Sequence, residues 1–240
     1  MIVVATLLCD RKRNSWLKGL ESVTRLQFQQ PWQIYVNLEQ TGRWDSGVYE
    51  PIFDLLNSCT IPYDYDFWSW TSTWWTAPKY DQDQSRLTPI VNARNMALAY
   101  ARATGASALM FVDADVIVPP HALATLEACG KSIVGGMVPG RGVHRAMRYI
   151  FGETNTWEGR LQICGHGTLG CCLIRREVFD YLSFRWGPAY PNGTILSEDP
   201  AYCNDAKVLL GQNFWMHHDV QCEHWDDPDA PLTDDQVAGF

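Results

Sequence analysis

Two aspartates stand at the end of an apolar run in the stretch ALMFVDADVIV, residues 108–118. Side chains two positions apart share a face of an extended strand, so Asp113 and Asp115 are expected to converge while Ala114 points away. Two carboxylates in one place do not both ionise easily without a counter-charge. A divalent cation supplies that charge, and Mg²⁺ or Mn²⁺ suits a site that also holds phosphates. Because D-x-D is common and strand-end aspartates often cap turns, the motif needs support from its surroundings.

A second pair of acids, Glu198 and Asp199, opens a predicted helix in the stretch SEDPAYCNDAKVLLG. A carboxylate within hydrogen-bond reach of a reacting hydroxyl can accept its proton, which is general base chemistry. The segment from Ser197 to Pro200 is also a good helix start, because the helix dipole favours acids in the first turn. Both interpretations can hold for the same side chains.

The elements that must position these acids begin with a strand, a helix and a second strand. Residues 1–8 form a continuous apolar run, typical of a parallel strand covered on both faces. A second strand is predicted over residues 32–40 and a short helix over 48–59, with Pro51 near its start. The β-α-β order predicts a parallel sheet. The amphipathic segment between the strands has an apolar face that consists of Trp16, Leu17, Leu20, Val23 and Leu26.

Residues 60–87 show irregularly spaced aromatic side chains among small polar residues. We expect a long loop here, and its tryptophans and tyrosines argue against disorder. The aromatic residues could form a satellite hydrophobic cluster or a stacking wall for a sugar or a base. A helix is predicted to follow, with Thr88 as its N-cap, Pro89 in its first turn and Gly105 at its end.

The second half of the chain is less regular. A helix over 119–130 and a buried strand over 131–138 follow the D-x-D strand. The tail, residues 226–240, is acidic and interrupted by prolines, so we expect it to be frayed. Further strands are predicted over 146–151, 160–164, 169–174, 213–217 and 220–224, with helices from Arg176 and over 199–211.

Composition limits the function classes. The chain of 240 residues is 46% hydrophobic, which suits one sizeable core and a single domain. A formal net charge of −8 repels nucleic acid at long range unless a local basic groove exists. The opening apolar run precedes its positive charges, so it is interpreted as a core strand rather than a signal peptide, and no later run is long enough for a membrane span. Eight scattered cysteines are expected to be reduced thiols in a cytoplasmic protein.

Two long runs carry a resemblance to a known family. The first, NARNMALAYARATGASALMFVDADVIVPPHALATLEACGKSIVGGMVP, joins an A-R-N helix, a strand ending in D-x-D, a proline-opened helix and a strand ending in G-G. The second joins GTLGCCLIRREVFDYL to SEDPAYCNDAKVLLGQNFWMHHDVQCEHW. Together with the first strands they resemble the metal-dependent glycosyltransferases of the GT-A fold, in particular the compact family-2-like enzymes of bacteria and phages. The resemblance leaves residues 40–87, parts of 140–165 and the tail unmatched.

The resemblance implies a Rossmann-like α/β fold, in which a mixed, mainly parallel sheet is flanked by helices and a small β lobe lies on the acceptor side. It implies a single domain over residues 1–225, followed by the acidic tail 226–240. The nucleotide-sugar half would be residues 1–115 and the acceptor half residues 116–225.

The resemblance also assigns roles in catalysis. It makes Asp115 the direct metal ligand, Asp113 a contact to ribose or metal, and His224 in VQCEHW a further ligand, with His217 and His218 as nearby decoys. A cation of this kind, Mn²⁺ or Mg²⁺, bridges the two phosphates of a nucleoside-diphosphate sugar and stabilises the leaving diphosphate. In inverting relatives the second acid of an E-D pair is the base, which corresponds to Asp199, while Glu198 orients sugar or acceptor.

The donor is expected at the ends of the first strands. In the family, positions such as Arg94 and Asn95 lie near the nucleotide or diphosphate, although a solvated surface charge is the ordinary role of an arginine. Thr6, Arg11 and Glu39 are placed at the nucleoside edge, and a UDP-sugar is the favoured donor. Glu39 departs from the pattern frequent at that turn, which bears on the identity of the base.

The acceptor is the least defined partner. Compact relatives include phage enzymes that glycosylate hydroxylated pyrimidines in DNA, which would place this chain in the host cytoplasm. Basic residues could contact the phosphates of DNA and tryptophans could stack an extruded base; a solvated charged face, or a saccharide or small-molecule acceptor, is the alternative. The candidate acceptor residues are Arg141, Arg145, His166, Trp186, Trp74 and Trp75, with His144, Arg148, Trp68 and Trp70 beside them in the sequence.

Three other classes are weaker. A sugar-1-phosphate nucleotidyltransferase shares the sheet and the metal, but its first strand leads into a glycine-rich loop that ATLLCDRKRNS lacks. A sugar-binding module without catalysis would explain the tryptophans but not the acids. A zinc protein built on Cys222 and His224 lacks a second ligand pair.

Overall fold

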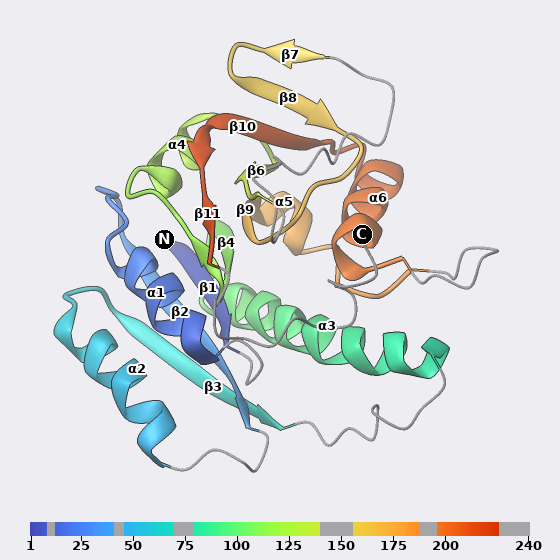
Figure 1. Ribbon diagram of the computed structural model, residues 1–240. Helices are drawn as coiled ribbons and strands as arrows, with labels where there is room; N and C mark the ends of the chain where they lie inside the picture. The colour runs from blue at the N-terminus through green and yellow to red at the C-terminus, as the bar shows by residue number, and fades with distance from the viewer. Residues whose placement is uncertain (9–12, 41–45, 70–78, 140–155, 188–195, 226–240) are drawn as a thin grey trace.

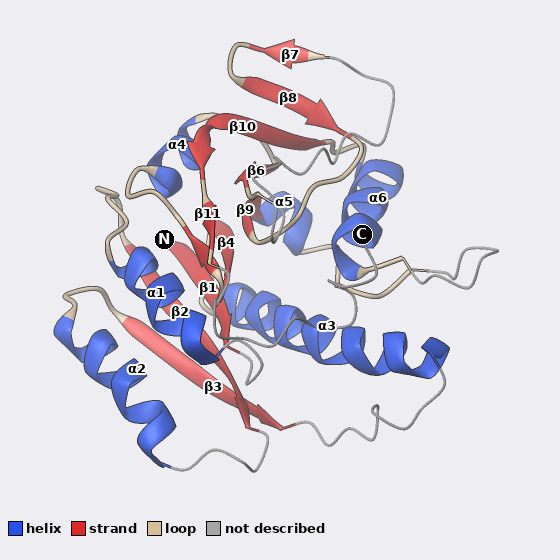
Figure 2. Ribbon diagram, in the orientation of Figure 1, coloured by secondary structure: helices blue, strands red, loops and turns tan. Residues whose placement is uncertain are grey.

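The chain forms one large mixed sheet with helices on both faces (Figures 1 and 2). The computed structural model describes residues 1–8, 13–40, 46–69, 79–139, 156–187 and 196–225. The strands are β1 (Ile2–Leu8), β2 (Trp32–Gln40), β3 (Tyr63–Ser69), β4 (Ala108–Asp113), β5 (Val116–Ile117), β6 (Ile133–Met137), β7 (Trp157–Glu158), β8 (Leu161–Cys164), β9 (Cys171–Arg175), β10 (Phe214–Gln221) and β11 (Glu223–His224). The helices are α1 (Arg13–Thr24), α2 (Ser46–Ser58), α3 (Lys79–Ala103), α4 (Ala122–Ala128), α5 (Arg176–Phe179) and α6 (Glu198–Leu210).

Parallel strands form the first half of the sheet. Strand β1 pairs in parallel with β2 and with β4, and β2 pairs in parallel with β3. The predicted β-α-β arrangement is therefore confirmed. Because these strands are parallel, their carboxyl ends lie at one edge of the sheet, where open α/β sheets bind ligands.

The second half adds antiparallel strands. Strand β9 lies antiparallel between β4 and β6, while β10 pairs in parallel with β6 and antiparallel with β8. A separate two-stranded ladder joins β11 to β5. The sheet order β3-β2-β1-β4-β9-β6-β10-β8-β7 confirms a mixed, largely parallel α/β sheet.

Each face of the sheet packs into its own hydrophobic cluster. Alternating residues of β1 enter opposite layers, as the period of a strand requires: Val4 packs with Trp16 of α1, and Val3 packs with Leu98 of α3. Both strand residues are fully buried, as predicted for a strand covered on both faces. Helices α1, α2 and α4 contribute to the first cluster, and α3, α5 and α6 to the second. No helix of the described chain combines the length and the apolar character needed to cross a membrane.

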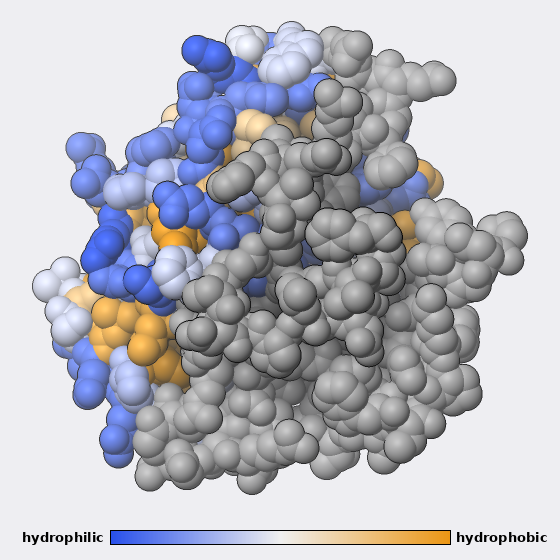
Figure 3. Space-filling view, in the orientation of Figure 1, coloured by the Kyte–Doolittle hydropathy of each residue, from blue (hydrophilic) through white to orange (hydrophobic). Residues whose placement is uncertain are grey.

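The prediction of a loop over residues 60–87 is wrong. Strand β3 occupies Tyr63–Ser69 as an edge strand, and its YDYDFWS stretch alternates aromatic and acidic residues with the period of two that a strand requires. Figure 3 shows hydrophobic side chains gathered on one face over α1, α2 and β3, elements to which the exposed Leu17 and Phe67 belong. Residues 70–78 lie outside the described ranges.

The start of the following helix is also corrected. Helix α3 begins at Lys79, so Pro89 lies inside it and Thr88 is not its N-cap. Proline removes one backbone donor from the helix ladder, which the length of this helix tolerates. The helix ends before Gly105, whose φ of +68° is the left-handed conformation expected of a C-terminal glycine. The strand predicted over 146–151 and the tail over 226–240 lie outside the described residues.

Helix α1 touches the turn that carries the D-x-D motif, and Gly19 makes this approach possible. A Cβ atom at Gly19 would lie 2.2 Å from the carbonyl oxygen of Ala114. We therefore expect Gly19→Ala to lower the free energy of unfolding by about 1–3 kcal/mol, although alanine raises helix propensity by about 1 kcal/mol. Urea unfolding measures this change. Leu17→Ala, at an exposed position of the same helix, is the control, and an alanine at 19 that stabilises the protein would contradict the close approach.

Candidate active site

The two aspartates of the D-x-D motif point to different partners. Asp113 is the last residue of β4, whereas Asp115 lies in the turn that follows. The expectation of an extended segment through both residues is therefore wrong, because the chain turns at Ala114 and Asp115. The Asp115 side chain is buried, and the Asp113 side chain is 31% exposed.

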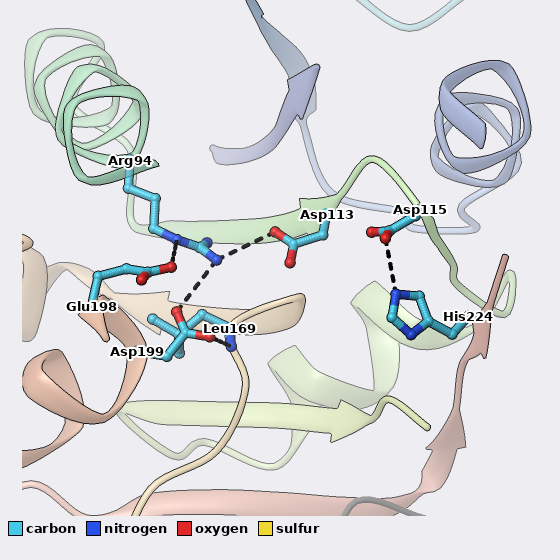
Figure 4. Close-up of polar contacts among 7 residues, drawn as sticks. All are labelled: Arg94, Asp113, Asp115, Leu169, Glu198, Asp199 and His224. Carbon is cyan, nitrogen blue, oxygen red and sulfur yellow. Dashed lines mark hydrogen bonds and ion pairs between the residues drawn. The ribbon is translucent and has the colours of Figure 1, made fainter. Parts of the chain in front are cut away.

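His224 lies against Asp115 although 109 positions separate them in the chain. The Nε2 atom of His224 is 2.9 Å from Oδ2 of Asp115 (Figure 4). The ladder between β11 and β5 creates this contact, because it places His224 opposite Val116, the residue after Asp115. The backbone N–H of Trp225 also donates to the carbonyl oxygen of Asp115 at 2.7 Å. The last strand thus brings an imidazole to the carboxylate.

The other ring nitrogen of His224 fixes the chemistry of this contact. Its Nδ1 lies 3.1 Å from the carbonyl oxygen of Pro139. A carbonyl oxygen only accepts hydrogen bonds, so Nδ1 carries the proton in this contact. The Nε2 atom then faces a carboxylate oxygen, and the contact requires either a proton shared between the ring and the carboxyl group or a cation that binds both atoms. A ring N–H held by a carbonyl is the usual arrangement behind a metal-binding histidine.

Arg94 of α3 is the centre of a second cluster (Figure 4). Its Nη2 lies 3.3 Å from Oδ1 of Asp113 and 3.3 Å from Oδ1 of Asp199, and its Nε lies 3.6 Å from Oε1 of Glu198. The side chain is 2% exposed, which excludes the solvated surface charge considered as its alternative role. The rings of Phe111 and Phe184 lie 5.1 and 5.6 Å from its guanidinium carbon.

Three carboxylates face one guanidinium in this cluster, so its charges are unbalanced. Burial alone would lower the pKa of Arg94, but Asp199, Asp113 and Glu198 outweigh burial and raise it above its ordinary value. Burial raises the pKa of Asp199 to about 8, and the charges of Glu198 and Asp113 act in the same direction. Arg94 and a backbone hydrogen bond oppose this rise. The cluster therefore favours either a bound proton or a further cation nearby.

Asp199 is held by the backbone of a neighbouring loop. The N–H of Leu169 donates to its Oδ2 at 3.0 Å. Among the described residues its buried Oδ1 has no hydrogen-bond partner, although this atom faces Arg94. Asp199 and Glu198 also lie in the first turn of α6, where the helix dipole favours acids. This placement agrees with the interpretation of the segment as a helix start.

Other predicted site residues have mixed surroundings. Thr6 is fully buried in β1, and its hydroxyl has no hydrogen-bond partner in the described part of the chain. The amide of Asn95 pairs with the backbone of Phe184, donating at 3.0 Å and accepting at 2.8 Å. His166 and Trp186 are half-buried, and burial lowers the pKa of His166.

Several predicted residues lie outside the described ranges, and their roles stay predictions: Arg11, Trp70, Trp74, Trp75, Arg141, His144, Arg145 and Arg148, together with the side chains of Glu39 and Trp68. The structure brings Asp113, Glu198 and Asp199 together around Arg94, and separately pairs Asp115 with His224. No group of three His, Cys, Asp or Glu side chains that could hold a metal ion occurs among the described residues. Sequence reasoning missed the carbonyl of Pro139 and the N–H of Leu169, since backbone groups leave no mark in residue type.

Ionisation of Asp199 should reduce stability at high pH. In the unfolded chain this group loses its proton near the ordinary aspartate pKa of 3.8, whereas burial in the folded protein raises the pKa to about 8. The folded state then holds the extra proton between these values, so the free energy of unfolding falls as the pH rises through this interval. We expect Asp199→Asn to remove part of that fall in urea unfolding at pH 5, 6.5 and 8. Asp205→Asn is the control, and an unchanged pH dependence in Asp199→Asn would argue against a raised pKa.

No protein-family model and no curated protein matches the sequence. Solved structures match over most of the chain. A197 from STIV has a TM-score of 0.50 at 13% identity, with 94% of this chain and 86% of that chain covered. TarS residues 1–349 from S. aureus has a TM-score of 0.55 at 12% identity, with 93% and 60% covered. The mannosyltransferase PcManGT from Pyrobaculum calidifontis, in complex with GDP-Man and Mn²⁺, has a TM-score of 0.58 at 12% identity, with 95% and 57% covered.

This chain thus spans about three fifths of the length of the TarS and PcManGT chains. Identities this low concern the fold alone. TarS and PcManGT are GT-A glycosyltransferases, and the predicted resemblance to that group is confirmed at the level of structure. The chain has a GT-A-like α/β fold.

Proposed function

We propose that the chain is a metal-dependent glycosyltransferase that moves a sugar from a nucleoside-diphosphate sugar to an acceptor hydroxyl. The observation that carries the proposal is the contact between His224 Nε2 and Asp115 Oδ2, with Nδ1 held by the Pro139 carbonyl. Asp115 lies just after β4, whose last residue is Asp113, and His224 belongs to β11. An imidazole oriented in this way against a carboxylate is suited to share a divalent cation.

The residues present fit Mn²⁺ better than Mg²⁺. Two side chains in contact do not form a complete cage, which agrees with an ion that takes its remaining ligands from phosphates and water. An imidazole ligand is poorly suited to Mg²⁺, which prefers oxygen. Asp115 and His224 would hold the ion, and Asp113 is a further predicted ligand or a ribose contact. When bound, the ion would stabilise the charge that develops on the departing diphosphate.

The donor is proposed to lie at the carboxyl ends of β1, β2 and β4. Structures similar to this chain include TarS in complexes with UDP and with UDP-GlcNAc, and PcManGT with GDP-Man and Mn²⁺. We favour a UDP-sugar. Thr6, Arg11, Glu39 and Asn95 stay predicted contacts to this donor.

Asp199 is proposed as the base of an inverting reaction. The acceptor oxygen would attack the anomeric carbon, the bond from that carbon to the diphosphate oxygen would break, and the acceptor proton would pass to Asp199. The Leu169 N–H holds one carboxylate oxygen in place. Once it has lost its proton, a carboxylate whose pKa is raised to about 8 is a stronger base than an exposed aspartate. Glu198 would orient the sugar or the acceptor.

A hydroxymethylated pyrimidine in DNA is the favoured acceptor. The reasons come from the sequence: the basic residues Arg141 and Arg145, and the tryptophans Trp74 and Trp75 that would stack an extruded base. His166 and Trp186 are further predicted acceptor contacts. A saccharide or a small molecule is the alternative acceptor.

A donor screen tests the proposal directly. UDP- and GDP-sugars are incubated with the protein and Mn²⁺, and the released nucleotide is measured with and without hydroxymethylated DNA, unmodified DNA or oligosaccharides. We expect Mn²⁺-dependent release from one donor and a stimulation by one acceptor class. Stimulation by hydroxymethylated DNA alone would support the DNA acceptor, and stimulation by oligosaccharides would replace it. Absence of Mn²⁺-dependent release from every donor would refute the proposal.

Removal of the Asp115 carboxylate should abolish metal-dependent binding. We expect Asp115→Ala to weaken Mn²⁺-dependent binding of UDP or GDP by at least about 100-fold, because losing a direct ligand costs at least as much as losing its supporting partner. Isothermal titration calorimetry measures this affinity. Asp205→Asn, which removes an acid that pairs with Arg185 on the surface, is the control. Full nucleotide binding by Asp115→Ala would show that the metal lies elsewhere.

Neutralising Asp199 should separate binding from transfer. We expect Asp199→Asn to bind nucleotide and Mn²⁺ within about twofold of the wild type, while sugar transfer falls by about 10²–10⁴-fold, the typical contribution of a general base. Steady-state kinetics with the donor identified by the screen provides the comparison. Unimpaired transfer by this variant would remove Asp199 as the base.

A further inference from the structure

Asp113 and Asp199 are connected on two sides. On one side, the same nitrogen of Arg94, Nη2, lies 3.3 Å from a carboxylate oxygen of each aspartate. On the other side runs the backbone of Leu169 and Gly170, which precedes β9. These contacts link the end of β4 to the first turn of α6, elements that are 86 positions apart at these two residues.

The Leu169–Gly170 backbone makes one hydrogen bond to each aspartate. Gly170, which has no side chain, also leaves space for the Asp113 carboxylate. Leu169 donates its N–H to Oδ2 of Asp199 at 3.0 Å, and the carbonyl of Gly170 accepts the N–H of Asp113 at 2.9 Å. A Cβ atom at Gly170 would lie 3.0 Å from Oδ2 and 3.4 Å from Cγ of Asp113. The Asp113 carboxylate therefore occupies the space that a side chain at position 170 would need.

On the other side, two aromatic rings lie against the guanidinium of Arg94. Arg94 is 2% exposed, and Phe111 and Phe184 lie beside its guanidinium. Phe184 is in turn fixed by the two hydrogen bonds between its backbone and the amide of Asn95. An arginine placed in this way contacts carboxylates inside the protein and does not face solvent.

We propose that Arg94 and Gly170 are positioning residues that hold Asp113 and Asp199 at a fixed spacing. The inference rests on the proposed function, in which Asp113 belongs to the donor side and Asp199 to the acceptor side. The distance between the leaving diphosphate and the proton acceptor is then set by this closed arrangement rather than by the bound substrates. Small displacements of reacting groups are costly because catalysis depends on alignment.

This role differs measurably from the phosphate contact that the sequence suggests for Arg94. A guanidinium bound to the diphosphate contributes to nucleotide affinity, so its loss raises the Kd. A positioning residue acts on the aligned reacting groups, so its loss lowers kcat and leaves the Kd nearly unchanged.

The first test replaces Arg94 by lysine. We expect Arg94→Lys to keep the Kd for UDP or GDP with Mn²⁺ within about threefold, and to lower kcat for the donor identified by the screen by at least about 30-fold, because one ammonium does not reproduce the planar fork of arginine. Arg102→Lys is the matched control, since Arg102 lies on the same helix and its guanidinium donates to the backbone carbonyls of Phe179 and Leu182. A rise in Kd of tenfold or more with kcat unchanged would overturn the inference in favour of a phosphate contact.

The second test leaves every charge in place. Gly170→Ala adds one methyl group, so Asp113 must move by a few tenths of an ångström. We expect a folded protein with kcat lowered by at least about tenfold. Gly135→Ala is the control for tight packing, because its Cβ would lie 2.7 Å from the ring of Phe214 and 3.1 Å from the carbonyl oxygen of Cys171, and would meet no carboxylate. Wild-type kcat in Gly170→Ala would overturn the role of Gly170.

A double-variant cycle decides the Arg94 part without any substrate. The urea midpoints of Arg94→Lys, Asp199→Asn and the double variant are compared with the wild type. If Arg94 holds Asp199, the midpoint loss caused by Arg94→Lys is smaller when residue 199 is already asparagine. Additive shifts would overturn the inference, whereas failure of the donor screen with a non-additive cycle would overturn only the proposed function.

Discussion

One buried ion cluster determines how this site is built: a single guanidinium, that of Arg94, faces the carboxylates of Asp113, Glu198 and Asp199. Glu198 and Asp199, which are largely buried beside Asp113, depend on this guanidinium, because an unpaired buried charge is expensive. The compensation is incomplete when all three acids are ionised, since one guanidinium faces three carboxyl groups. The excess negative charge makes this end of the sheet receptive to protons and to cations, and it raises the pKa of Asp199 in addition to the effect of burial.

Strand pairing brings the members of the site together from distant parts of the chain. Strand β9 pairs with β4, which places the Leu169–Gly170 backbone beside Asp113. The two-residue ladder of β11 with β5 places His224 on Asp115. Arg94 comes from the long helix α3, which packs on the face of the sheet opposite to α1, α2 and α4. Different long-range contacts thus bring His224 to Asp115 and the Leu169–Gly170 backbone to Asp113, and the same contacts belong to the fold.

Much of the fold follows from local pattern. The apolar run of β1 and the β-α-β order predict parallel pairing correctly, because burial on both faces leaves a composition that can be recognised in the sequence. Strand β3 was missed although aromatic and acidic residues alternate along its first part. It lies at the edge of the sheet, so it lacks the continuous apolar run that marks a strand buried on both faces. The chemical types of the site residues were recognisable, but the burial of Arg94 and the turn at Asp115 were not. Both depend on packing between segments far apart, which spacing along the chain does not encode.

The contact between Asp115 and His224 closes a loop of 109 positions. Contacts of such high sequence separation carry a large entropy of closure and raise the contact order of the protein, which slows folding. The imidazole reaches its carboxylate through the ladder between β11 and β5, which joins the last described strand to the turn after β4. A cation that binds this pair would therefore recognise only the completed fold, and by mass action it would stabilise that state over every partly folded one.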